Sequence, residues 1–147
     1  MTAGGGALAT ALSVSATAAA AGQAPDPVFA AIEEHKAAHA KVVSWVDRYG
    51  KLESEIPAEK RRSDTDSIVE TDDPRWIEAE RQLDLAWDAE DSAAWALLEA
   101  LPSTREGLST LIEYAQFRGD QWPEGWQVGL LENIAEALPQ LWQEGRV

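Results

Sequence analysis

The sequence predicts an all-α fold: a single-domain bundle of about four helices, two of them long and antiparallel and two shorter. Three observations support this fold class. Apolar residues recur at helical spacing in four segments, helix-start signals precede these segments, and no segment shows the alternation of a strand. The 147 residues are enough for one domain with a core of its own. Each segment has one apolar stripe, which must be buried against another helix.

The two long helices are predicted at residues 27–55 and 75–101, and each follows an Asp-Pro pair. The aspartate can accept hydrogen bonds from free N–H groups of the first turn, and proline loses nothing there by lacking one. Pro57 and Pro102 end the two helices. Residues 57–73 between them are polar and charged, which predicts a mobile connection or hairpin tip.

The two shorter helices are predicted at residues 104–118 and 125–138. Ser103 and Glu106 form a capping-box pattern at the start of the first, and Pro139 is expected to end or kink the second. The core stripes of the long helices are predicted at Val28, Ile32, Val42 and Val46 and at Trp76, Leu83, Trp87, Ala94, Leu97 and Leu101.

The chain is strongly acidic, with a formal net charge of −14. Such a surface repels phosphate groups, so we expect neither a nucleic-acid partner nor binding to anionic membranes. Solubility alone explains the charge, and the alternative is a protein partner with a basic surface. The sequence has no cysteine, and it has no phosphate-binding loop or serine-elbow motif, so no cofactor is predicted.

Residues 1–25 contain no charged residue, and we expect them to lie outside the folded domain, residues 26–147. The run from Ala7 to Ala21 is too short and too weakly apolar to span a bilayer. It has the proportions of a signal-peptide core and resembles the later part of a twin-arginine export signal, without the arginine pair. We therefore expect an exported, periplasmic protein without membrane insertion. The alternative is a cytoplasmic protein with a low-complexity tail.

Two histidines and a glutamate fall where apolar residues are expected. His35 and His39, the only histidines, lie one turn apart within the apolar face of the first helix. Glu90 lies near the centre of the stripe of the second helix. In an antiparallel hairpin that turns around residues 57–73, residues whose numbers sum to about 130 lie at the same level, as His39 and Glu90 do. These three residues form a candidate buried polar cluster.

Four interpretations of this cluster stay open. The one we expect is a structural hydrogen bond between His39 and Glu90 that fixes helix register, with His35 bonded to water or backbone. In the second, the three residues bind a divalent metal ion, although the sequence lacks a zinc-protease helix and a Glu-x-x-His pair. The third is acid–base catalysis by His39 and Glu90, without an accompanying nucleophile. The fourth is a pH-responsive core.

Four of the seven tryptophans are candidates for a partner surface. Trp45 and Trp95 fall off the apolar stripes, and packing against the shorter helices is the simpler explanation for them. Trp122 and Trp126 flank a Pro-Glu-Gly turn that would pin the last helix to the bundle. If these side chains are exposed together, they form a binding surface, since Trp is enriched at interaction hot spots.

Three segments of the chain resemble segments of other proteins. They are residues 26–36 (DPVFAAIEEHK), residues 101–104 (LPST) leading into 111–114 (LIEY), and Trp122-Pro123 followed by residues 130–138 (LLENIAEAL). Together they resemble a group of small alphaproteobacterial helical proteins without an assigned activity. The resemblance spans most of residues 26–142 and implies a helical fold. It carries over no functional residue.

The function that the sequence favours is that of a non-catalytic, acidic helical interaction protein with an unidentified protein partner. The alternative is a metal-binding or enzymatic bundle that uses His35, His39 and Glu90. A third hypothesis is a bundle whose helices close over a small apolar ligand.

Overall fold

The structure, a computed structural model, describes residues 24–61, 71–119 and 121–143. Within these ranges the chain is helical and contains no strand, which confirms the predicted fold class. The elements are α1 (Pro27–Glu55), the short 3₁₀ helix η1 (Ala58–Lys60), α2 (Pro74–Glu99), α3 (Arg105–Arg118) and α4 (Trp126–Gln143). The predicted bounds of the first three α-helices differ from these by two residues at most.

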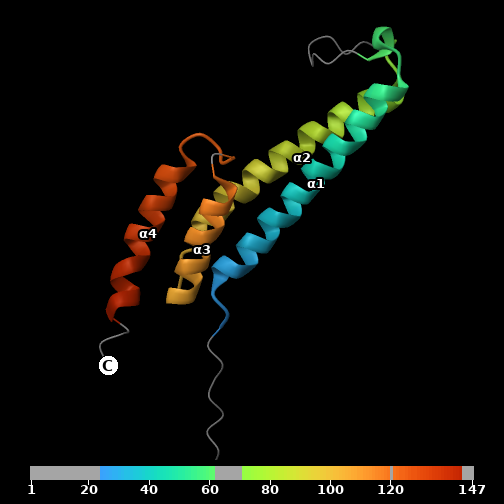
Figure 1. Ribbon diagram of the computed structural model, residues 1–147. Helices are drawn as coiled ribbons and strands as arrows, with labels where there is room; N and C mark the ends of the chain where they lie inside the picture. Colours follow the sequence, from blue (N-terminus) through green and yellow to red (C-terminus); the bar gives the residue numbers. More distant parts are fainter. Residues whose placement is uncertain (1–23, 62–70, 120, 144–147) are drawn as a thin grey trace, which may run out of the picture.

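The long helices α1 and α2 form an antiparallel hairpin, and the shorter helices flank one end of it (Figure 1). Helix α3 packs against α1, and α4 packs against α2. The other end of the hairpin projects beyond both short helices (Figure 1). The hairpin is therefore the scaffold, and α3 and α4 form a second layer over only part of it.

Two separate apolar clusters stabilise this arrangement. The junction core lies where all four helices meet, and the tip core lies in the projecting half of the hairpin. The junction core comprises Val28, Ile32, Ala94, Leu97, Leu111, Ala115, Trp122 and Trp126. The tip core comprises Leu52, Ile56, Trp76 and Ala79, with Trp45 and Tyr49 packed against it.

The seam between α1 and α2 follows a seven-residue repeat. The repeat places Val28, His35, Val42, Tyr49 and Ile56 of α1 and Trp76, Leu83, Glu90 and Leu97 of α2 in buried or half-buried positions. An α-helix has about 3.6 residues per turn, so a seven-residue repeat drifts across the helix surface by about 20° per repeat. A second row of buried side chains lies beside these positions, and the drift shifts it along the hairpin: on α1 it passes from Ile32, four residues after a repeat position, to Leu52, three residues after one.

This drift explains two wrong predictions. Val46 and Trp87 were expected in the core stripes, but they are 46% and 50% exposed. At these levels the second row lies three residues after a repeat position, so that Trp45 is half-buried and Ala86 is buried. A stripe that keeps a spacing of four residues from the repeat positions along the whole of each helix misses this shift.

One carboxylate ties the start of α1 to the start of α3. Oδ1 of Asp26 accepts a hydrogen bond from the N–H of Val28 at 3.0 Å and caps α1. Oδ2 accepts from the N–H groups of Ser103 and Thr104 and from the Thr104 hydroxyl, at 2.7 to 2.9 Å. A Cβ atom at Gly107 would collide with this carboxylate. The N-cap of α3 is Thr104, because its hydroxyl accepts from Gly107; the expected capping box with Ser103 is wrong.

The predicted end of the last helix at residue 138 is also wrong, since α4 continues through Pro139 to Gln143. A proline inside a helix removes one hydrogen bond to the carbonyl four residues earlier, here Ala135. Ala135 is exposed, so water can satisfy that carbonyl. Leu141, beyond the proline, is buried, and its packing favours continuation of the helix.

The described ends of the hairpin connection are bonded to each other. The N–H of Asp73 donates to the carbonyl of Lys60 at 3.0 Å, and the Lys60 ammonium donates to the carbonyl of Thr71 at 3.1 Å. The rest of the predicted connection, residues 62–70, lies outside the described residues, as do residues 1–23 of the expected export segment. Among the helices that are described, none has the length and apolar character needed to cross a bilayer.

Candidate functional site

Polar side chains from three helices meet at the carboxylate of Glu90. Its Oε1 lies 2.8 Å from Nδ1 of His39 on α1 and 2.6 Å from Nη2 of Arg118 on α3. Glu90 and Arg118 are both buried, and His39 is partly exposed. Within the described chain, Oε2 of Glu90 and Nε of Arg118 have no hydrogen-bond partner. Because each charge offsets the other in a buried setting, this contact holds α2 and α3 in register.

His35 lies one turn before His39 and makes a different set of contacts. Its side chain is 1% exposed, and Nδ1 lies 2.8 Å from the hydroxyl of Tyr114 on α3. Its ring lies 4.9 Å from the ring of Trp122, which in turn stacks on Trp126 at 3.6 Å. His35, His39, Glu90, Tyr114 and Arg118 are named the polar cluster below. The polar cluster borders the junction core through Trp122.

The surroundings of His35 favour its neutral form. Burial lowers the pKa of His35 to about 4, and the nearby guanidinium of Arg118 acts in the same direction. The carboxylate of Glu90 acts in the opposite direction and raises the pKa of His35, whereas His39 lowers it further. Burial also raises the pKa of the Tyr114 phenol. At neutral pH the contact between His35 and Tyr114 is therefore a hydrogen bond between two uncharged side chains.

The structure brings together all three residues of the predicted cluster, but in a larger group than the sequence indicated. His39 pairs with Glu90 as the antiparallel register predicts. His35 bonds to a side chain, Tyr114, and the expected water or backbone partner is wrong. Sequence reasoning missed Tyr114 and Arg118. Their spacing of four residues puts both on one face of α3, which was the one available signal.

A second polar pair lies in the same seam, ten residues after His39 on α1 and ten residues before Glu90 on α2. Glu80 of α2 is buried, and Tyr49 of α1 is hydrogen-bonded to it. Burial and this hydrogen bond raise the pKa of the Tyr49 phenol. The numbers of Tyr49 and Glu80 have the same sum as those of His39 and Glu90, so the register rule would have found this pair had it been applied to every buried carboxylate.

The geometry does not support a metal ion at the polar cluster. In the described ranges no group of three His, Cys, Asp or Glu residues is arranged to hold one. Nδ1 of each histidine already contacts another side chain, and the guanidinium of Arg118 stands beside the only carboxylate. A positive charge at that place repels a cation. The same contacts form two separate hydrogen-bonded groups, His35 with Tyr114 and Glu90 with His39 and Arg118, and neither group includes a serine, threonine or lysine.

The four tryptophans do not form one exposed surface. Trp122 and Trp126 are buried, and their indole N–H groups donate to the carbonyls of Ala115 and Ala94. Trp45 packs on the tip core, whose residues come from the α1–α2 hairpin and not from a short helix as expected. Trp95 is 43% exposed and lies beside Gly129 of α4.

Two grooves border the polar cluster and the junction core. The side groove, between α1 and α3, has a volume of about 680 Å³, and its lining is Lys36, His39, Ala40, Tyr114, Phe117, Arg118 and Gln121. The docking groove, between α3 and α4, has a volume of about 340 Å³, and its lining is Ile112, Ala115, Gln116, Gly119, Trp122, Trp126, Gln127, Leu130, Leu131 and Ile134.

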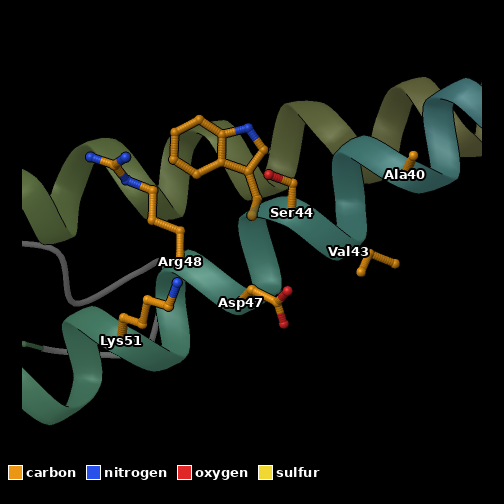
Figure 2. Close-up of a pocket in the computed structure, with 7 residues that line it drawn as sticks. Ala40, Val43, Ser44, Asp47, Arg48 and Lys51 are labelled. Carbon is orange, nitrogen blue, oxygen red and sulfur yellow. The ribbon is translucent and has the colours of Figure 1, made fainter.

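A third concave surface lies on the projecting half of the hairpin. All of its described lining residues belong to α1, and those labelled in Figure 2 include Val43, Asp47, Arg48 and Lys51. A ligand there would contact one helix of the described chain. Since a binding site needs walls from more than one side, the two grooves at the helix junction are the better candidates.

Comparison of the chain with protein-family models, with curated proteins and with solved structures finds no match.

Proposed function

We propose that the protein is a non-catalytic interaction module whose docking groove binds an amphipathic helix of a partner protein. The observation that carries this proposal is the chemistry of the groove. None of the described residues that line it is charged, although the chain has a net charge of −14. Apolar grooves between helices are a common binding site for the apolar face of a partner helix.

The apolar surface extends beyond the groove along α4. Leu131, Leu138 and Trp142 have a spacing of i, i+7 and i+11, which puts them on one face, and they are 67%, 36% and 66% exposed. Leu131 also lines the groove, so the groove and this stripe are continuous. At about 1.5 Å per residue, the stripe is about 16 Å long, which matches roughly three turns of a partner helix.

The charge around the groove selects for a basic partner. Residues 121–143 carry Glu124, Glu132 and Glu136 and contain no Lys or Arg. A helix with an apolar stripe and Lys or Arg beside it would bury the stripe and place its charges near these carboxylates. Such complementarity increases the association rate and makes binding sensitive to salt.

A designed peptide pair tests this proposal. One peptide is an amphipathic helix with a leucine stripe and flanking lysines, and the other has glutamates in place of the lysines. We expect the lysine peptide to bind at least about tenfold more tightly by isothermal titration calorimetry, with affinity that falls as salt rises.

Two variants place the binding in the groove. Leu131→Gln should lower the affinity for the lysine peptide by about tenfold, because it removes an exposed apolar contact. Leu85→Gln is the matched control, since Leu85 is 51% exposed on α2 and does not line the groove. Equal affinity of the two peptides, or equal effects of the two variants, would contradict the proposal. A homodimer that Leu131→Gln dissociates would assign the groove to a second copy instead.

We propose in addition that the protein acts in the periplasm after export. The uncharged run up to Ala21, with small residues after it, supports this location. Mass spectrometry of the native protein should find a mature N-terminus between residues 20 and 25. Recovery of the chain from the cytoplasm with Met1 intact would refute export without affecting the docking groove.

A further inference from the structure

The side groove has a lining unlike the rest of this acidic chain. Lys36, His39 and Arg118 contribute basic side chains to it, and its lining includes no Asp or Glu among the residues that the structure describes. The groove also presents two aromatic rings, Tyr114 and Phe117. A cavity of about 680 Å³ with a few basic groups and aromatic walls has the size and chemistry of a small-molecule site.

The basic groups differ in how they are held. Arg118 is 8% exposed, and its Nη2 donates to Glu90, while its Nε has no partner within the described chain. The ammonium of Lys36 lies 5.6 Å from the ring centre of Tyr114 and pairs with Glu33 at 2.7 Å in an exposed contact. Nδ1 of His39 is used by Glu90, which leaves its Nε2 edge for another partner.

These pairings limit the charge that the groove can accept. Glu90 offsets Arg118, and Glu33 offsets part of the charge of Lys36. A ligand with two or more negative charges, such as a phosphate group, would meet the carboxylates behind these cations. A single carboxylate needs only the donors that face the groove, and charge-assisted hydrogen bonds to Lys or Arg are strong for that group.

Phe117 supplies the apolar part of the site. Its side chain is 87% exposed, although it stands beside the buried Arg118. With the phenol ring of Tyr114, it gives the groove an aromatic wall next to the basic groups. An aromatic or alkyl body of a ligand would cover this surface and gain roughly 25 cal/mol for each Å² that it removes from water.

We propose that the side groove binds a small organic monocarboxylate with an aromatic or alkyl body. The carboxylate contacts the exposed ammonium of Lys36 beside the positive charge of Arg118, and the apolar body packs on Tyr114 and Phe117. This site is separate from the docking groove, and it does not depend on the proposed partner helix.

Binding of 4-phenylbutyrate to the full chain tests this proposal, with 4-phenylbutanol as the neutral probe of the same shape and phenyl phosphate as the more highly charged one. We expect the carboxylate to bind at least about fivefold more tightly than either of the others by calorimetry. Amide chemical shifts should change at residues 36–40 and 114–121 and stay constant at the tip core.

Exposed positions give variants that leave the fold intact. Lys36→Gln and Phe117→Ser should each lower the affinity for 4-phenylbutyrate by at least about fivefold. The first variant removes the charge, and the second removes the apolar wall. Lys41→Gln is the control for loss of one exposed positive charge on α1. Leu131→Gln in the docking groove should have no effect.

Three results would overturn the proposal. The first is absence of binding at about 10 mM ligand, a concentration that reveals even weak sites. The second is equal affinity for the carboxylate and the alcohol, which would indicate apolar association alone. The third is an equal effect of Lys36→Gln and Lys41→Gln, which would indicate attraction by the general field of the protein.

Discussion

Nη2 of Arg118 on α3 lies 2.6 Å from Oε1 of Glu90 on α2, and the two residues are 28 positions apart in the chain. Both side chains are 7% exposed, so neither charge can turn to water when the other is removed. Replacing a buried ion pair by apolar residues can be neutral, whereas breaking it by removing one partner is costly. The pair therefore behaves as one unit in any mutational experiment.

We expect Glu90→Gln to lower the free energy of unfolding by about 3 kcal/mol, because the guanidinium of Arg118 is left buried without a countercharge. His39→Ala should cost about 1 kcal/mol or less, since His39 is partly exposed. Urea denaturation at pH 7 measures both. The double variant Glu90→Gln with Arg118→Met should recover most of the loss, and failure to do so would mean that Glu90 acts mainly through His39.

The lowered pKa of His35 should make the stability of the folded protein depend on pH. Its pKa is about 4 in the folded protein and about 6.5 in the unfolded chain. Between these values the unfolded chain binds the proton and the folded protein does not, so stability is complete above pH 6.5 and falls as the pH decreases toward 4. The shift corresponds to a loss of about 3 kcal/mol over this window.

His35→Gln isolates this effect, because glutamine is neutral throughout and can still bond to Tyr114. Urea denaturation at pH 7, 6, 5 and 4.5 should show a smaller loss of stability in the variant than in the wild type. The charges around His35 are those of Arg118, Glu90 and His39. Since these remain in the variant, equal slopes in the two proteins would assign the pH dependence to them.

The helix bounds were predictable because the signals are local. An Asp-Pro pair acts through hydrogen bonds within one turn, so both long helices begin where the sequence indicates. The pairing of His39 with Glu90 was predictable as well, because antiparallel register depends mainly on the place of the turn.

The rest of the site depends on distances that local patterns do not contain. Val46 and Trp87 were misplaced because a small drift per heptad accumulates over a long hairpin. Tyr114 and Arg118 were missed because the angle at which α3 crosses α1 follows from packing at the junction core. The burial of Trp122 has the same origin, since its partner rings come from α1, α3 and α4.

Two glycine substitutions should have opposite effects on stability. Gly107→Ala places a Cβ against the carboxylate of Asp26, which must move and loses hydrogen bonds to Ser103 and Thr104. We expect a loss of about 1–3 kcal/mol. Gly50→Ala on α1 meets nothing within 4 Å, and it should stabilise the helix by about 0.5–1 kcal/mol.

Thermal denaturation of the two variants in parallel tests this contrast. Equal shifts of the melting temperature would mean that Asp26 adapts to the added methyl group without loss of its bonds. In that case the carboxylate would not be the rigid link between α1 and α3 that its hydrogen bonds indicate.

The ionisation of the two tyrosines should be suppressed by the fold. Burial raises the pKa of Tyr49, and its hydrogen bond to Glu80 raises it further, because a phenolate beside that carboxylate is unfavourable. Burial raises the pKa of Tyr114 as well. For an acid whose folded pKa is raised, stability is complete below the unfolded pKa of about 10 and is lost as the pH rises above it.

Absorbance at the tyrosinate band therefore should rise near pH 10 in urea and only at higher pH in the native protein. The chain has two tyrosines, so single variants separate their contributions. Tyr114→Phe should leave the more strongly suppressed group, and Tyr49→Phe the less suppressed one. If the Tyr49 phenol of the folded Tyr114→Phe variant ionises near pH 10, Tyr49 is not bonded to Glu80. That result would contradict the second polar pair of the hairpin.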